Sequence, residues 1–131
     1  MSRRYLVDTH VVVDAGTEAG YQSIPAKVRR ILEDPDVELL LSVVSEAELA
    51  VKYKIGKLDL NKDELALICS NAAINSYPLR AQHVAQLFEL PLHHKDPFDR
   101  MIISTAICDD IPVITCDRWF RKYKGLRVVW G

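Results

Sequence analysis

The sequence lacks a long apolar segment, an appreciable net charge and paired cysteines. Its longest apolar stretch, VELLLSVVS (37–45), is too short to span a bilayer. The net charge of −1 gives no overall attraction to nucleic acid or to an anionic membrane, so binding of a polyanion would need a local patch. The three cysteines, Cys69, Cys108 and Cys116, form no CxxC pair. An odd number without a framework is typical of a reduced protein, and we expect a cytoplasmic location.

No signal peptide, repeat or long linker is visible either. The apolar start after Arg3 and Arg4 is interrupted at Asp8, which is too early for a secretory signal. The chain has 131 residues, 49% of them hydrophobic and 27% charged, which is an ordinary globular composition. We therefore expect residues 1–131 to form a single domain without a membrane partner.

Short apolar strands alternate with helical patterns along the chain. We expect strands at 4–8, 37–42, 74–79, 112–115 and 127–130. Helices are expected at 24–33, 46–55, 62–72, 80–88 and 98–109, with a helical turn at 117–123. This alternation predicts an α/β fold with a parallel sheet of four to five strands.

The segment HHKDPFDRMIISTA (93–106) brings two carboxylates to the start of an apolar helix. Asp96 is a good N-cap, because the proline after it fits the first helical position. Asp99 is different, since it shares a helix face with Ile102, Ile103 and Ala106. An ionised carboxylate on a buried face is costly unless it has a partner.

Four acids fall where the carboxyl edge of a parallel sheet is expected. Asp8 ends the first strand, Asp117 follows the fourth, and Glu48 and Asp99 lie in the first turns of two helices. Open α/β sheets bind their ligands at this edge. Each acid also has a simpler explanation: Ser45 and Glu48 have capping-box spacing, Asp117 could cap a helix, and Asp8 could begin a turn. One common site explains all four together.

Converging carboxylates repel one another, which raises their pKa values unless cations lie between them. Clusters of oxygen ligands suit Mg²⁺ or Mn²⁺. Such ions activate water and stabilise the charge on a phosphate that is being cleaved. His10, His93 and His94 match no zinc spacing, and the acids around them favour a harder ion.

Four motifs in order, YLVDTH (5–10), SVVSEAELAVKYKIGKL (42–58), HHKDPFDRMIISTA (93–106) and VITCDRWFRKY (113–123), resemble the PIN domain, specifically the VapC-type toxins of bacterial toxin–antitoxin pairs. The resemblance implies a three-layer α/β/α fold, an endoribonuclease dependent on Mg²⁺ or Mn²⁺, and a cognate antitoxin. It implies that Asp8, Glu48, Asp99 and Asp117 are the catalytic, metal-binding quartet. It also implies secondary roles for Thr115, a recurrent hydroxyl, and for Asp96, the extra acid of this subgroup. Relatives often carry Trp at the position of Ala47, and Glu46 beside it is a rival acid.

The segment RWFRKYKGLR (118–127) contains five basic residues with three aromatic residues between them. Arg118, Arg121 and Lys122 are therefore expected to contact RNA phosphates, with aromatic rings stacking on unpaired bases. The alternative is a solvated face over core aromatics. The segment KYKIGK (52–57) is interpreted as a solvated helix end.

Other functions were weighed against the nuclease. A phosphatase of the haloacid dehalogenase type needs a second Asp where this chain has His10, and a receiver domain needs an acidic pair at the first strand. An inactive PIN-like binding module would not need all four acids. We also expect a homodimer, with apolar residues at 11–16 and 46–55 as a partner groove or dimer face, unless these residues are core.

Overall fold

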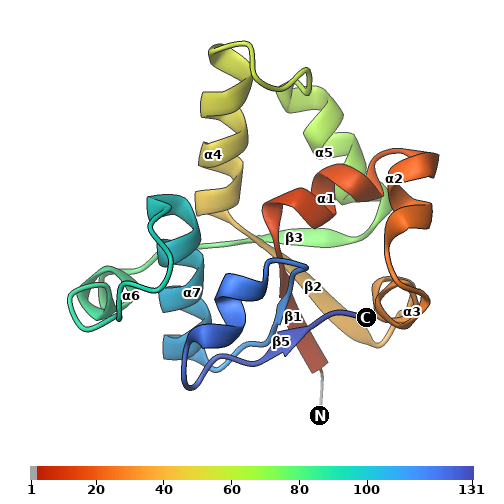
Figure 1. Ribbon diagram of the computed structural model, residues 1–131. Helices are drawn as coiled ribbons and strands as arrows, with labels where there is room; N and C mark the ends of the chain where they lie inside the picture. The colour runs from red at the N-terminus through yellow and green to blue at the C-terminus, as the bar shows by residue number, and fades with distance from the viewer. Residues whose placement is uncertain (1–2) are drawn as a thin grey trace.

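The computed structural model describes residues 3–131, which form a five-stranded parallel sheet in the order β3-β2-β1-β4-β5. The strands are β1 (Arg3–Val7), β2 (Val37–Ser42), β3 (Ile74–Tyr77), β4 (Val113–Ile114) and β5 (Val128–Val129). The helices are α1 (Thr9–Ala15), α2 (Glu18–Ser23), α3 (Ala26–Leu32), α4 (Val43–Lys54), α5 (Lys62–Asn71), α6 (Ala81–Gln86) and α7 (Pro97–Asp109), followed by the 3₁₀ helix η1 (Arg118–Lys122). Figure 1 shows β1 at the centre of the molecule, with helices on both sides of the sheet.

Alternating side chains of the central strands build a core on each face of the sheet. Leu6 and Leu40 pack with residues of α7 and η1, including Ile103 and Phe120. Their strand neighbours point the other way and pack with residues of α1, α3 and α5; they include Val7, Leu39, Leu41 and Ile114. The predicted three-layer α/β/α arrangement with five strands is therefore confirmed.

Residues 9–23 differ from the prediction, because they form α1 and α2 where no element was expected. Val11 and Val12 on α1 are buried in the core, so the proposal of a partner groove at 11–16 is wrong for these two residues. A run of three β-branched residues gives no helical spacing, and Asp8 makes no side-chain cap that would mark the start.

Several helices and strands begin or end at other residues than the sequence predicted. Helix α4 begins at Val43 rather than 46, because Ser42 caps it by accepting a hydrogen bond from the backbone N–H of Val44. The strands expected at 112–115 and 127–130 contain only two residues each. The alternative that Ser45 caps α4 is thus wrong, and Ser45 is instead a buried residue of the first turn.

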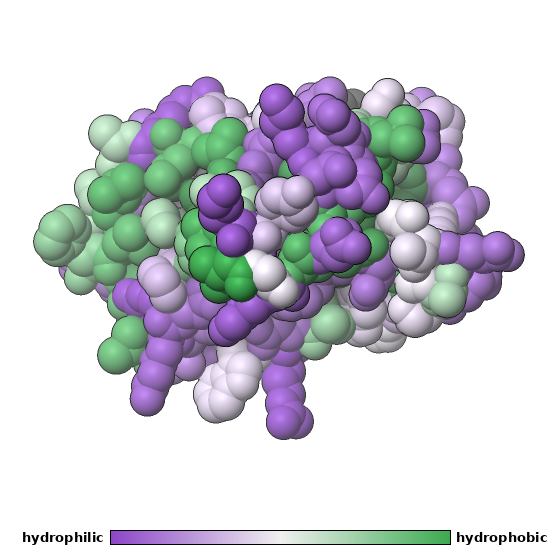
Figure 2. All heavy atoms as spheres, turned by 90° about the horizontal axis from the view of Figure 1, so that it is seen from above, coloured by the Kyte–Doolittle hydropathy of each residue, from purple (hydrophilic) through white to green (hydrophobic). Residues whose placement is uncertain are grey.

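The described residues include no helix with both the length and the apolar character that crossing a membrane requires. All three cysteines are free, as expected for a chain without a disulfide framework. Exposed large hydrophobic residues lie at the end of α4, at Val51 and at the C-cap Ile55, and around α6, at Val84, Phe88 and Leu92. Seen from above, hydrophobic side chains gather over the left half of the molecule, the side on which Figure 1 shows α6 (Figure 2).

Candidate metal centre

The four predicted acids lie at the carboxyl edge of the sheet and at the nearby ends of two helices. Asp8 directly follows β1, Asp117 lies shortly after β4, and Asp99 lies in the first turn of α7. Glu48 lies in the second turn of α4 and not in the first as expected, because the helix begins at Val43. Asp8 and Glu48 are only 2% and 3% exposed, whereas Asp99 and Asp117 are half-buried. Four segments that are distant in sequence therefore contribute carboxylates to one edge.

Only one of the two carboxylate oxygens of Asp8 accepts a hydrogen bond within residues 3–131. Thr115 Oγ1 donates a hydrogen bond of 2.9 Å to Asp8 Oδ2, whereas the buried Oδ1 has no hydrogen-bond partner among the described residues. Burial raises the pKa of Asp8, the Thr115 hydrogen bond opposes this shift, and the charge of Glu48 adds to it. A buried, unpartnered carboxylate oxygen is costly and indicates that this atom binds a ligand.

Asp99 lies on the buried stripe of α7, as its spacing predicted, because Ile102, Ile103 and Ala106 are all buried. Burial raises the pKa of Asp99 to about 7, and the negative charges of Asp8, Asp96 and Glu48 contribute to the increase. The Asp99 carboxylate is therefore close enough to the other acids to be repelled by them.

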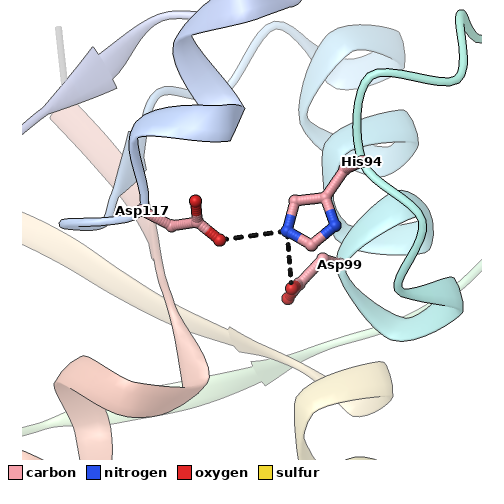
Figure 3. Close-up of side chains that lie close together, drawn as sticks. All are labelled: His94, Asp99 and Asp117. Atoms are coloured by element: carbon pink, nitrogen blue, oxygen red, sulfur yellow. Dashed lines mark hydrogen bonds and ion pairs between the residues drawn. The ribbon is translucent and has the colours of Figure 1, made fainter.

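His94 bridges two of the acids. Its Nε2 lies 3.1 Å from Asp99 Oδ2 and 3.0 Å from Asp117 Oδ2 (Figure 3). The other ring nitrogen, Nδ1, accepts a hydrogen bond from the backbone N–H of Asp96. Since Nδ1 is an acceptor, Nε2 carries the proton and donates to the carboxylates. His94 thus aligns two acids that come from different segments.

The loop that carries His94 is held in place from two sides. Arg100 donates hydrogen bonds to the backbone carbonyls of Leu90 and Pro91, and the Tyr123 hydroxyl accepts one of 2.7 Å from the His94 N–H. From the sequence, His94 was a candidate only for zinc, and its contact with the two acids was not predicted. The loop conformation that creates it has no periodic signal.

Glu48 has a partner on each of its carboxylate oxygens. Thr9 Oγ1 lies 3.1 Å from Glu48 Oε1 and 2.8 Å from Ser45 Oγ, and Lys52 Nζ lies 2.9 Å from Glu48 Oε2. The interpretation of 52–57 as a solvated helix end is therefore wrong for Lys52. The spacing of four residues from Glu48 to Lys52 was a signal that could have revealed this pair.

The remaining acids have capping contacts. Asp96 Oδ1 accepts hydrogen bonds from the backbone N–H groups of Phe98 and Asp99, which confirms its N-cap role. Asp117 caps a helix and also lies in the acidic cluster. Its Oδ1 accepts a hydrogen bond from the Trp119 N–H at the start of η1, while its Oδ2 faces His94. The rival acid Glu46 lies elsewhere: its carboxylate accepts a hydrogen bond from Ser76 Oγ on β3.

The basic segment after Asp117 is divided between core and surface. Phe120 and Tyr123 are buried, as the core alternative proposed, whereas Trp119 is 48% exposed. Lys122 Nζ lies 4.8 Å from the centre of the Trp119 ring. Arg118 and Arg121 are exposed beside them. One aromatic ring and three cations therefore remain available on the surface next to Asp117.

This donor set fits a hard divalent cation. The side-chain oxygens come from four acids, two of which have raised pKa values, and Asp8 Oδ1 is an unused ligand atom. His94 Nε2 and one oxygen each of Asp99 and Asp117 lie within 4.8 Å of one another. Because His94 Nε2 carries a proton, the oxygens are the better ligands, and oxygen ligands suit Mg²⁺ or Mn²⁺.

Comparison with known proteins assigns the fold to a family. The family described as "PIN domain" matches residues 5–126. No curated protein matches this chain in sequence. Among solved structures, the VapBC2 complex from Rickettsia felis, bound to a promoter DNA fragment, contains a similar chain (TM-score 0.72, 18% identity, 98% of this chain and 99% of that one). Similar chains also occur in DNA-bound VapBC from Salmonella typhimurium (TM-score 0.69, 18% identity, 98% of both chains). A third occurs in VapBC-5, a toxin–antitoxin system of Mycobacterium tuberculosis (TM-score 0.63, 20% identity, 98% of both chains). The chain belongs to the PIN domain family.

Proposed function

We propose that this protein is an endoribonuclease dependent on Mg²⁺ or Mn²⁺ and the VapC-type toxin of a toxin–antitoxin pair. The observation that carries the proposal is Oδ1 of Asp8, which is buried and has no hydrogen-bond partner within residues 3–131, in a PIN fold with three further carboxylates at the same edge. The rival phosphatase would need an acid where His10 stands, and the family match does not support it. All four acids of the family pattern are present, which argues against an inactive binding module.

Asp8, Glu48, Asp99 and Asp117 are the residues that would hold the metal. A bound divalent ion supplies an activated water and stabilises the charge that develops on the phosphate. The hydroxyl of Thr115 holds Oδ2 of Asp8 and leaves Oδ1 for a ligand, and His94 contacts both Asp99 and Asp117. These contacts orient the ligands before the metal arrives.

Arg118, Arg121 and Lys122 are proposed to bind the RNA backbone. Their charges lie on the exposed surface next to Asp117, so a strand that they hold would pass close to the acids. The exposed ring of Trp119 is suited to stacking on an unpaired base. The net charge of −1 makes this local patch necessary, because the whole protein does not attract RNA.

The proposed partner is an antitoxin encoded by the gene next to that of this protein. Both proteins are proposed to be cytoplasmic. The similar chains named above come from toxin–antitoxin complexes, which supports this proposal. An arginine or lysine of the partner could pair with the acids where a metal would bind. Co-expression with the adjacent small gene should give a stable complex without nuclease activity, and full activity of the assembled complex would contradict inhibition.

The nuclease proposal is tested by incubating the purified protein with single-stranded RNA, with Mg²⁺, with Mn²⁺ and with a chelator. Cleavage should require the metal and should disappear in Asp8→Asn, whose circular dichroism should match the wild type. Asp59→Asn, which changes an exposed aspartate between α4 and α5, is the matched control and should cleave normally. Cleavage by Asp8→Asn at the wild-type rate would refute the metal assignment.

A further inference from the structure

Lys52 is a cation in contact with the acidic cluster. It lies one helical turn after Glu48 on α4, and its Nζ is 2.9 Å from Glu48 Oε2. Glu48 is almost fully buried, whereas the Lys52 side chain is 36% exposed. The hydrogen bond to Glu48 raises the pKa of the Lys52 ammonium, and the charges of Glu48, Asp96 and Asp99 add to this effect. Lys52 therefore contacts the cluster while part of its side chain remains in solvent.

Each carboxylate oxygen of Glu48 has one partner in this arrangement. Thr9 Oγ1 lies against Oε1, and Lys52 Nζ occupies Oε2. A hydroxyl can remain beside a metal-bound carboxylate, but an ammonium group and a metal cation repel each other at the same oxygen. Metal binding at Glu48 Oε2 would therefore displace Lys52.

The displaced ammonium would still be tethered close to the site. Lysine has a flexible four-carbon stem and a compact charge, so it can move several ångströms without any movement of α4. The scissile phosphodiester of a substrate has to approach the acids from solvent, and Lys52 is partly exposed there. A phosphate oxygen would give the ammonium a new anionic partner.

We propose that Lys52 exchanges partners during the reaction, pairing with Glu48 in the metal-free protein and with the RNA phosphate once the metal is bound. The proposal rests on the proposed nuclease function and adds a substrate-contacting residue to it. The simpler alternative is a static pair that only stabilises α4, as many pairs at this spacing do. The two accounts differ in the sign of the effect on metal binding.

The test uses Lys52→Gln, with Lys54→Gln as the matched control. Lys54 lies on the same helix, is exposed, and forms no ion pair within residues 3–131. Titration with Mn²⁺ alone, followed by calorimetry, should show about two- to fivefold tighter binding for Lys52→Gln, because the competing ammonium is gone. Lys54→Gln should bind Mn²⁺ as the wild type does.

The second measurement is cleavage of a single-stranded RNA oligonucleotide at saturating Mn²⁺. Lys52→Gln should lose about tenfold or more in kcat/KM, the loss expected for one charged contact. The slope of log(kcat/KM) against log[salt] should become shallower by about 0.7, the amount expected for one phosphate contact on a single strand. Lys52→Arg, which keeps the charge, should recover most of the rate, and Lys54→Gln should retain it.

The outcomes separate this proposal from the one on which it rests. If the wild type binds Mn²⁺ and cleaves RNA but Lys52→Gln binds Mn²⁺ equally or more weakly, the partner exchange is refuted and the nuclease function stands. Unchanged cleavage or an unchanged salt slope in Lys52→Gln also refutes it. If the wild type neither binds Mn²⁺ nor cleaves RNA, both proposals fail. Tighter metal binding together with slower cleavage supports the exchange, because a purely structural lysine would not move the two in opposite directions.

Discussion

Replacing Asp99 with asparagine should stabilise the metal-free protein at neutral pH. The Asp99 carboxyl is held among Asp8, Asp96 and Glu48, and burial and repulsion raise its pKa from 3.8 to about 7. Asparagine has nearly the same shape and resembles the protonated acid. It therefore removes a charge that the fold tolerates poorly while it leaves the buried stripe of α7 intact.

The size of the effect follows from the pKa shift and depends on pH. A carboxyl with a raised pKa binds a proton more tightly in the folded than in the unfolded protein, so stability falls as the pH rises from about 4 to about 7. At about 1.4 kcal/mol per pKa unit, the wild type loses on the order of 4 kcal/mol across this interval. Asp99→Asn has no carboxyl at this position and should not lose this stability. Its free energy of unfolding should equal that of the wild type near pH 4 and should be higher by up to about 4 kcal/mol at pH 8.

Urea denaturation at a series of pH values, in the presence of a chelator, measures this difference. Asp59→Asn is the control, because it removes an exposed aspartate and should follow the wild-type profile. A stability difference between Asp99→Asn and the wild type that does not change with pH would refute the reasoning. So would a variant that is less stable than the wild type at pH 8.

Adding metal should reduce the stability advantage of Asp99→Asn over the wild type. A ligand that binds only the folded state stabilises it by about 2.7 kcal/mol at a concentration one hundred times its dissociation constant. The wild type should gain this from Mn²⁺, and Asp99→Asn should gain much less because it lacks one of the proposed ligands. Equal stabilisation of both proteins by Mn²⁺ would show that Asp99 does not contact the metal.

Three further predictions concern neighbouring residues and assembly. Glu48→Gln should reduce RNA cleavage far more than Glu46→Gln, because Glu46 contacts Ser76 instead of the cluster; a larger loss from Glu46→Gln would mean that the ligand has moved. Asp96→Ala should lower the free energy of unfolding by about 1 kcal/mol through the lost N-cap of α7, and unchanged urea midpoints would argue against the cap. Light scattering at micromolar concentration should show a dimer, for which the exposed Val51 and Ile55 are candidate contacts; a monomer would contradict this expectation.

The sheet and the positions of the acids could be predicted from the sequence because both depend on local patterns. Short apolar runs marked the strands, and the rule that strand ends and helix starts share one edge brought Asp8, Asp99 and Asp117 together. The spacing of Asp99 from Ile102 and Ile103 placed it on the buried stripe of α7, where the structure leaves it half-buried. These inferences needed only periodicity and chain order.

The partners of the acids could not be predicted in the same way. His94 meets Asp117 across 23 positions, through a loop whose shape depends on Arg100. The helix α1 was missed because its run of valines has no helical spacing and its core contacts decide its structure. For the His94 loop and for α1, contacts with distant parts of the chain decide the conformation, and the local sequence does not.

The hydrogen bond between Thr115 and Asp8 joins residues that are 107 positions apart in the chain. The two residues meet only when β4 pairs with β1 at the centre of the sheet. A chain on which β4 has not yet docked has no hydroxyl to orient Asp8, and it lacks Asp117 at the edge. The arrangement of the acids therefore depends on a contact between the two ends of the chain. If the protein is the proposed nuclease, loosening of the β1–β4 pairing would inactivate it without any change to its acids.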